Sequence, residues 1–199
     1  NGLFGVPRYD LLLLIALAIQ AWMVWFKLET FDELKAICLF HVVGFALEVF
    51  KTSGQIGSWS YPDPAYTKVF GVPLFSGFMY ACVGSYIARA IRLFEIKYLN
   101  YPPLWTTWTL ALLAYINFFT HHYTIDIRLG LFAFSGLIFW RTWFVFTPDK
   151  KPRHMPMLIG LLLVSFFIWI AENAGTFAAA WVYPSQQDGW HMVSIEKMG

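Results

Sequence analysis

The chain is dominated by apolar runs of about the length that crosses a lipid bilayer. A membrane-spanning helix needs roughly 20 mostly apolar residues to cross a hydrocarbon core of ~30 Å. Six stretches reach this length once their flanks are included: Tyr9–Phe26, Asp32–Phe50, Val72–Ile91, Pro103–Thr120, Asp126–Phe146 and Met155–Ala180. The sequence therefore predicts an all-α polytopic membrane helix bundle with six spans, forming one transmembrane domain over residues 1–199.

Composition agrees with a membrane protein and excludes other classes. Hydrophobic residues make up 58% of the chain and charged residues 13%, against roughly 25% charged residues in average soluble domains. The formal net charge is only +2, so no basic surface argues for a nucleic-acid partner. The 20 Phe, 10 Tyr and 10 Trp residues exclude a disordered chain. Cys38 and Cys82 both lie in apolar runs, which argues against a disulfide framework.

Basic residues predict the orientation, because cytoplasmic loops carry an excess of Lys and Arg. The side reached after the first, third and fifth spans holds Lys27, Lys35, Arg89, Arg92, Lys97, Arg141, Lys150, Lys151 and Arg153. The opposite side holds Arg8, Lys51, Lys68, Arg128 and Lys197. Nine residues against five place the first side in the cytoplasm and the N-terminus outside.

The second and sixth expected spans end on the same pattern. Each has an aromatic residue three positions before a glutamate, and a Trp-x-Tyr-Pro string follows that glutamate. The residues are Phe45, Glu48, Trp59 and Tyr61 in the first copy, and Trp169, Glu172, Trp181 and Tyr183 in the second. Such an echo is what two three-helix units joined by a linker helix would give, a rhodopsin-like 3+1+3 plan with a seventh helix beyond Gly199. The alternative is a chance match between interfacial aromatic anchors.

Glu48 and Glu172 are the candidate catalytic residues. An ionisable side chain within a spanning segment is costly and is a functional candidate by default. Both glutamates lie about 25 Å above the cytoplasmic start of their helices at 1.5 Å per residue, so they share one depth. Burial or mutual repulsion would raise the pKa of at least one of them and make it a proton donor near neutral pH. The structural alternative is a carboxylate that pins the two Trp-x-Tyr-Pro strings.

Aromatic and histidine side chains complete a candidate ligand pocket around these glutamates. His41 lies two turns before Glu48 on the same helix face, although a lone helical histidine is more often a packing residue. The pocket residues are His41, Trp59, Tyr61, Trp169, Trp181 and Tyr183.

A third cluster follows the fourth expected span. His121, His122 and Asp126 offer nitrogen and oxygen ligands for a metal ion. Asp126 has two other interpretations, as the N-cap of the fifth helix or as the ion-pair partner of Arg128.

Several runs resemble a known family over essentially the whole chain. They include Gly57-Ser-Trp-Ser-Tyr-Pro, Gly71-Val-Pro-Leu-Phe-Ser-Gly-Phe-Met-Tyr and Phe167-Ile-Trp-Ile-Ala-Glu-Asn-Ala-Gly-Thr-Phe. The chain resembles the YoaT-like bacterial integral membrane proteins of unknown function (domain of unknown function 817). The resemblance implies a multi-pass inner-membrane protein with one more helix beyond Gly199, and it implies no activity.

A looser likeness is to the membrane carotenoid cyclases and hydratases, which pair intramembrane glutamates with Trp, Tyr and Gly-x-Pro-Leu elements. That likeness implies a rhodopsin-like bundle with acid-catalysed chemistry on polyene ends. The adjacent carboxylate pair of the cyclases is missing from this sequence. A likeness at the level of the fold carries little weight for function.

The sequence leaves three functions open. The first is an enzyme or binding protein for an isoprenoid or other apolar ligand, with a glutamate as general acid. The second is a non-catalytic accessory or assembly subunit of a larger membrane complex, in which aromatic side chains contact pigment, lipid or partner helices. The third is a proton-coupled transporter, for which the repeat and the acids are the motivation. The expected partners are membrane lipids, an apolar ligand or pigment and other membrane subunits, and no cofactor is indicated.

Overall fold

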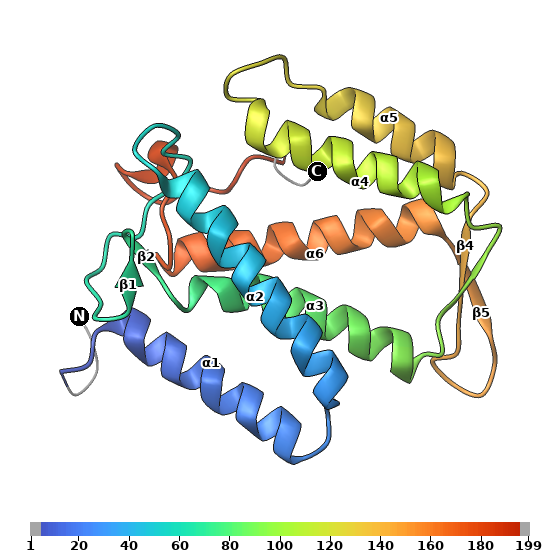
Figure 1. The fold of residues 1–199 in the computed structure, drawn as a ribbon, viewed down its shortest axis with the longest axis horizontal. Helices are drawn as coiled ribbons and strands as arrows, with labels where there is room; N and C mark the ends of the chain where they lie inside the picture. The colour runs from blue at the N-terminus through green and yellow to red at the C-terminus, as the bar shows by residue number, and fades with distance from the viewer. Residues whose placement is uncertain (1–4, 196–199) are drawn as a thin grey trace. The chain divides into compact units, whose positions relative to one another are not determined.

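The structure is a computed structural model that describes residues 5–195. Its helices are α1 (Arg8–Trp25), α2 (Phe31–Thr52), α3 (Ser76–Leu93), α4 (Leu104–Thr120), α5 (Arg128–Phe139), α6 (Met157–Phe177) and the 3₁₀ turn η1 (Pro184–Gln186) (Figure 1). Its strands are β1 (Lys68–Val69), β2 (Val72–Pro73), β3 (Lys97–Leu99), β4 (Trp143–Phe146) and β5 (Arg153–Pro156).

The prediction of an all-α bundle with six spans is wrong, although each of the six expected stretches overlaps one α-helix. Within residues 5–195, only α1 and α6 are long and apolar enough to cross a membrane, with mean hydropathies of 1.4 and 1.9. α4 and α5 are short, at 17 and 12 residues. α2 carries Asp32, Glu33 and Lys35 in its first turns, which dilutes its apolar character. The rhodopsin-like 3+1+3 plan depended on those spans and falls with them, and its seventh helix was expected beyond the described residues.

The two long apolar helices indicate association with a membrane. In each of these helices, only 11% of the 18-residue apolar stretch is buried within the protein. A helix at the core of a soluble protein would bury most of such a window, because water is a poor solvent for apolar surface. Bilayer lipid is the solvent that suits two helices of this length and exposure.

The described chain divides into two compact units, residues 5–89 with 169–195, and residues 90–168. In the first unit the start of α1 is tied to two other segments. Asp10 accepts the backbone N–H groups of Tyr66 and Thr67 at 2.8 and 2.9 Å. The Arg8 guanidinium donates to the carbonyls of Ala178 and Ala179 just after α6, which satisfies carbonyls that a helix end leaves open. The single domain expected from the sequence stays a prediction.

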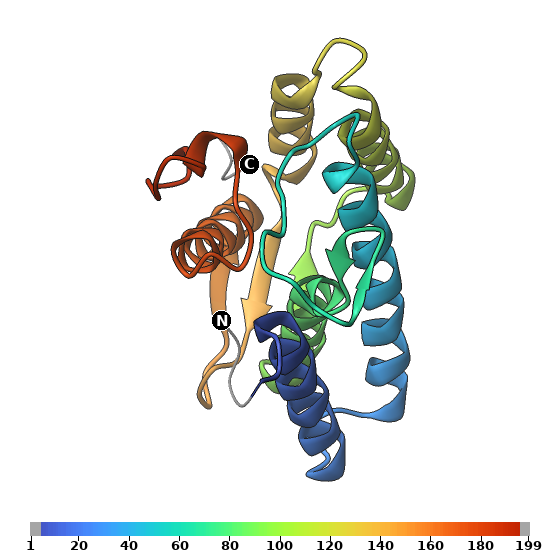
Figure 2. The same ribbon diagram turned by 90° about the vertical axis from the view of Figure 1, so that its left-hand side faces the viewer.

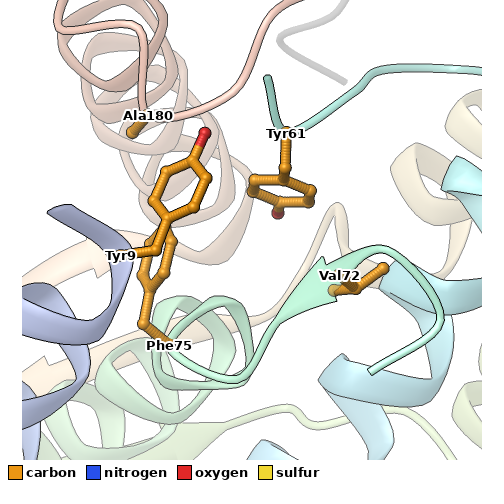
Figure 3. Close-up of a cluster of buried hydrophobic side chains, with 5 residues drawn as sticks. All are labelled: Tyr9, Tyr61, Val72, Phe75 and Ala180. Carbon is orange, nitrogen blue, oxygen red and sulfur yellow. The ribbon is translucent and has the colours of Figure 1, made fainter. Parts of the chain in front are cut away.

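A small aromatic core holds this end of the first unit together. Its buried residues are Tyr9, Tyr61, Val72, Phe75 and Ala180 (Figure 3). The rings of Tyr9 and Phe75 stack at 5.3 Å, and the ring of Tyr61 meets both edge-on at 5.9 and 6.2 Å. The cluster therefore joins α1, the loop after α2, the β2 region and the segment after α6.

In the second unit α4 and α5 form an antiparallel helical hairpin, and the two helices lie side by side in both ribbon views (Figures 1 and 2). The other element is an antiparallel sheet in the order β3-β4-β5. This sheet was not predictable from the sequence, because strands of three or four residues are too short to show an alternating pattern. The charged, proline-bounded segment of residues 147–152 connects β4 and β5.

Candidate functional site

Glu48 lies at the centre of a buried hydrogen-bond network. Its side chain is on α2, and the residue is only 2% exposed. Its Oε2 accepts from the Trp59 Nε1–H and the Tyr61 hydroxyl, both at 2.7 Å, and its Oε1 accepts from the Tyr80 hydroxyl at 2.8 Å. Three donors from two further segments thus converge on one carboxylate, which is the arrangement that makes a buried charge tolerable.

Glu172, near the end of α6, has a related but more open environment. The Tyr183 hydroxyl donates to its Oε1 at 3.1 Å. The residue is half-buried rather than buried. Each glutamate is therefore bonded by the tyrosine of its own Trp-x-Tyr-Pro string.

The two strings pair with each other. Ser60 and Val182 form an antiparallel bridge in which each backbone N–H donates to the other's carbonyl at 2.9 Å. Each occupies the variable position between the Trp and the Tyr of its string, so the pairing relates one string to the other by a local twofold axis. The ring of Trp59 also meets that of Tyr183 edge-on at 6.1 Å. The structure thus brings the two glutamates into one cluster.

Glycines make room for the aromatic side chains of this cluster. A Cβ at Gly44, one turn before Glu48, would overlap the Tyr80 ring. A Cβ at Gly175, three residues after Glu172, would overlap the ring of Trp181. Tyr80 can cross α2 and reach Glu48 because position 44 has no side chain.

Tyr80 is the member of the network that sequence reasoning missed. It lies on α3, outside both Trp-x-Tyr-Pro strings. The available signal was the glycine at position 44, since a glycine on the Glu48 face of a helix is a place where another segment can approach closely.

Burial and hydrogen bonding act in opposite directions on the Glu48 carboxyl. Burial raises its pKa, the three hydrogen bonds lower it, and the net direction is upward. Burial and the nearby carboxylates raise the pKa values of Tyr61, Tyr80 and Tyr183, so these hydroxyls keep their protons and act as donors. The negative charge of Glu172 helps to raise the pKa of Tyr80, and the negative charge of Glu48 helps to raise the pKa of Tyr183. The two halves of the cluster therefore form one electrostatic unit.

Comparison with known proteins decides the family. Residues 2–199 match the model of a family described as "Protein of unknown function (DUF817)". The chain belongs to the DUF817 family. It is also 48% identical to "Uncharacterized protein YoaT" of Bacillus subtilis (strain 168) over 193 residues. This matching region covers 97% of this chain and 72% of the YoaT protein. No solved structure matches the chain significantly. The resemblance found in the sequence is thereby confirmed.

Two of the expected pocket residues of this DUF817 chain lie outside the glutamate network. His41 packs against Gly77, whose added Cβ would lie 2.6 Å from its Nδ1, and its ring tilts against Phe78 at 4.5 Å. Its Nδ1 is buried without a hydrogen bond, and burial lowers the pKa of the imidazole, which suits a neutral packing residue. Trp169 donates its Nε1–H to the carbonyl of Val193 at 3.0 Å, so this contact fastens the segment after α6.

The histidine cluster of the DUF817 chain does not gather as a metal centre. In the part of the chain that the structure describes, no three His, Cys, Asp or Glu side chains lie close enough to hold an ion. Asp126 accepts the Arg128 backbone N–H at 2.9 Å and the Asn117 amide at 3.0 Å, and it pairs with the Arg128 guanidinium at 3.1 Å. The rings of His121 and His122 lie 3.9 Å apart. The N-cap of α5 is Ile127 and not Asp126, so of the two other interpretations the ion pair with Arg128 is confirmed.

Proposed function

We propose that the chain binds an isoprenoid-like apolar ligand at the Glu48–Glu172 cluster and exchanges a proton with it through Glu172. The observation that supports this assignment is the difference between the two carboxylates. Glu48 is buried and holds three donors, whereas Glu172 is half-buried with a tyrosine on one oxygen. Pairs of titratable groups in contrasting environments are typical of sites that divide acid and base roles.

The position of the cluster suits a ligand that comes from a bilayer. The Arg8 contacts with Ala178 and Ala179 bring the start of α1 next to the end of α6. These are the two helices that could cross a membrane. Glu172 lies within the last turns of α6, so a ligand in the lipid reaches it near the boundary of the apolar layer.

The chemistry that this arrangement can support is acid catalysis on a carbon–carbon double bond. A protonated Glu172 would give its proton to one carbon of a polyene end and leave a cation on the ligand. The same carboxylate would then take a proton from a neighbouring carbon, so the step needs no oxidant or reductant. The indole rings of Trp59 and Trp181 would stabilise the cation.

We further propose that the protein lies in the bacterial inner membrane with its N-terminus outside. Basic residues follow α1 at Lys27 and Lys35 and precede α6 at Lys150, Lys151 and Arg153. The opposite end of α1 carries one basic residue in its first turn, Arg8. This asymmetry supports a cytoplasmic location for the end of α1 and the start of α6.

Native extraction tests the proposal. The full chain would be purified in a mild detergent, and the material that accompanies it would be identified by mass spectrometry and by its absorption spectrum. We expect a polyene, quinone or other isoprenoid at a fixed ratio to the protein. E172Q should bind the ligand but lose its conversion, and a Glu172→Gln variant that converts it at the wild-type rate would exclude the proton transfer.

A second candidate, an accessory subunit of a membrane complex, is favoured by the surface of α4. Trp105 and Trp108 on this helix are 69% and 73% exposed, and large exposed aromatic residues are common at binding surfaces. A protein partner at fixed stoichiometry, without an apolar ligand, would support this role and contradict the first.

A further inference from the structure

The sheet of the second unit has two chemically different faces. Residues paired across neighbouring strands point to the same face, and the register places Tyr98, Phe144 and Met155 in one row. The rings of Tyr98 and Phe144 lie 5.3 Å apart. A Cβ at Gly160 of α6 would overlap Phe144, so this face of the sheet packs on α6.

The opposite face is basic and aromatic. Lys97, Val145 and His154 form one row on it, and Trp143 lies on the same face in a neighbouring row. Lys97 and His154 are exposed, and Trp143 is 40% exposed. Just before β4, the Arg141 guanidinium lies 4.5 Å above the ring of Trp140.

The turn between β4 and β5 adds further charge. Lys150 and Lys151 are exposed there, and Asp149 pairs with Arg153 at 2.8 Å. Residues 141–156 contain four Lys or Arg residues and one Asp, a net charge of +3, which exceeds the +2 of the whole chain. The positive charge of the protein is therefore concentrated at this sheet.

We propose that this surface binds the anionic headgroups of membrane phospholipids. We name it the basic sheet and define it by Lys97, Arg141, Trp143, Lys150, Lys151 and His154. β5 ends at Pro156 and α6 begins at the next residue. A sheet joined directly to the start of a spanning helix lies at the depth of the headgroups, where basic side chains meet anionic lipid and aromatic rings are favoured. The inference rests on the membrane-spanning role of α6 in the proposed function, and it concerns a separate site.

A cleft beside the edge strand β3 lies on the Tyr98 face of the sheet, not on the basic face, and a lipid whose headgroup binds the basic sheet could reach it with a chain around that edge. It has a volume of about 320 Å³ and is lined by Tyr98, Tyr101, Leu104 and Met157. Two aliphatic side chains and two tyrosine rings suit part of an acyl chain. Asn100, between these tyrosines, donates to the backbone carbonyl of Arg141 at 3.4 Å, which ties the end of β3 to the segment before β4.

The test compares lipids on the purified full chain. Phosphatidylglycerol or phosphatidylcholine would be titrated into the protein in a neutral detergent, and bound lipids would be counted by native mass spectrometry. We expect phosphatidylglycerol to bind at least about tenfold more tightly, as a few juxtamembrane basic residues predict. The triple variant K97Q/K150Q/K151Q should lose most of this preference.

A matched variant and a soluble anion complete the design. K97R/K150R/K151R changes the same three residues but retains their charges and should keep the preference. Inorganic phosphate at the same concentration should not displace the lipid. Equal binding of the two lipids, an equal loss in both triple variants, or displacement by phosphate would overturn the proposal. E172Q should keep the lipid preference, so failure of the proposed function would be distinguishable from failure of this one.

Discussion

Ser60 and Val182 exchange two backbone hydrogen bonds of 2.9 Å, although one follows α2 and the other follows α6. Because each occupies the variable position of a Trp-x-Tyr-Pro string, this bridge holds the two tyrosines, and hence the glutamates they bind, close to each other. A substitution at either glutamate should therefore lower the stability of the paired strings. The loss of stability should differ in size between the two positions.

Glu48→Gln is expected to destabilise the protein by about 1–3 kcal/mol. In the wild type both carboxylate oxygens accept hydrogen bonds, from Trp59, Tyr61 and Tyr80. In the variant, the amide NH₂ group replaces one of these oxygens and faces a donor with which it cannot bond. Thermal unfolding in mild detergent measures the change. Glu172→Gln is the matched control, and it should cost less, since Glu172 is half-buried. An equal cost at both positions would contradict the division of roles.

Gly44→Ala should cost about 1–3 kcal/mol by overpacking. The new methyl group overlaps the Tyr80 ring and pushes its hydroxyl away from Glu48. Gly136→Ala, in α5, is the control, because a Cβ there meets nothing within 4 Å and alanine favours a helix. The double variant G44A/Y80A should be less destabilised than the sum of its single variants, and additive costs would show that the two positions are not coupled.

The sequence predicted the helices better than it predicted their environment. The first two expected spans begin within one residue of α1 and α2. The prediction of six spans was wrong because the second expected span includes the charged residues Asp32, Glu33 and Lys35. The all-α prediction was wrong because β3, β4 and β5 are too short to show a strand pattern. The echo around Glu48 and Glu172 identified the two strings. Their pairing through Ser60 and Val182 was not predictable, since it depends on contacts between distant segments. The catalytic role of the glutamates stays a prediction.

The stability of the protein should depend on pH through Glu48. Burial raises the pKa of this carboxyl above its ordinary value of 4.5. Below about pH 4.5 the carboxyl is protonated in both states, and its contribution to stability is fully present. As pH rises through the raised pKa, the folded protein resists ionisation and this contribution is lost. The advantage of wild type over E48Q in unfolding temperature should therefore shrink as pH rises, and a constant difference would contradict the assignment.

Asp126 should behave as the partner of Asn117 and Arg128 in the turn before α5, and not as a metal ligand. The Asn117 amide and the Arg128 backbone N–H lower the pKa of its carboxyl, so its contribution is present above its ordinary value of 3.8 and is lost as pH falls through the lowered pKa. Asp126→Ala should lower the unfolding temperature at neutral pH, because it removes the partner of both groups. His122→Ala is the control for metal binding: Zn²⁺ should leave the unfolding temperatures of wild type and H122A equally unchanged. A rise with Zn²⁺ in wild type that H122A abolishes would restore the metal site, since only a bound ion stabilises the folded state in that way.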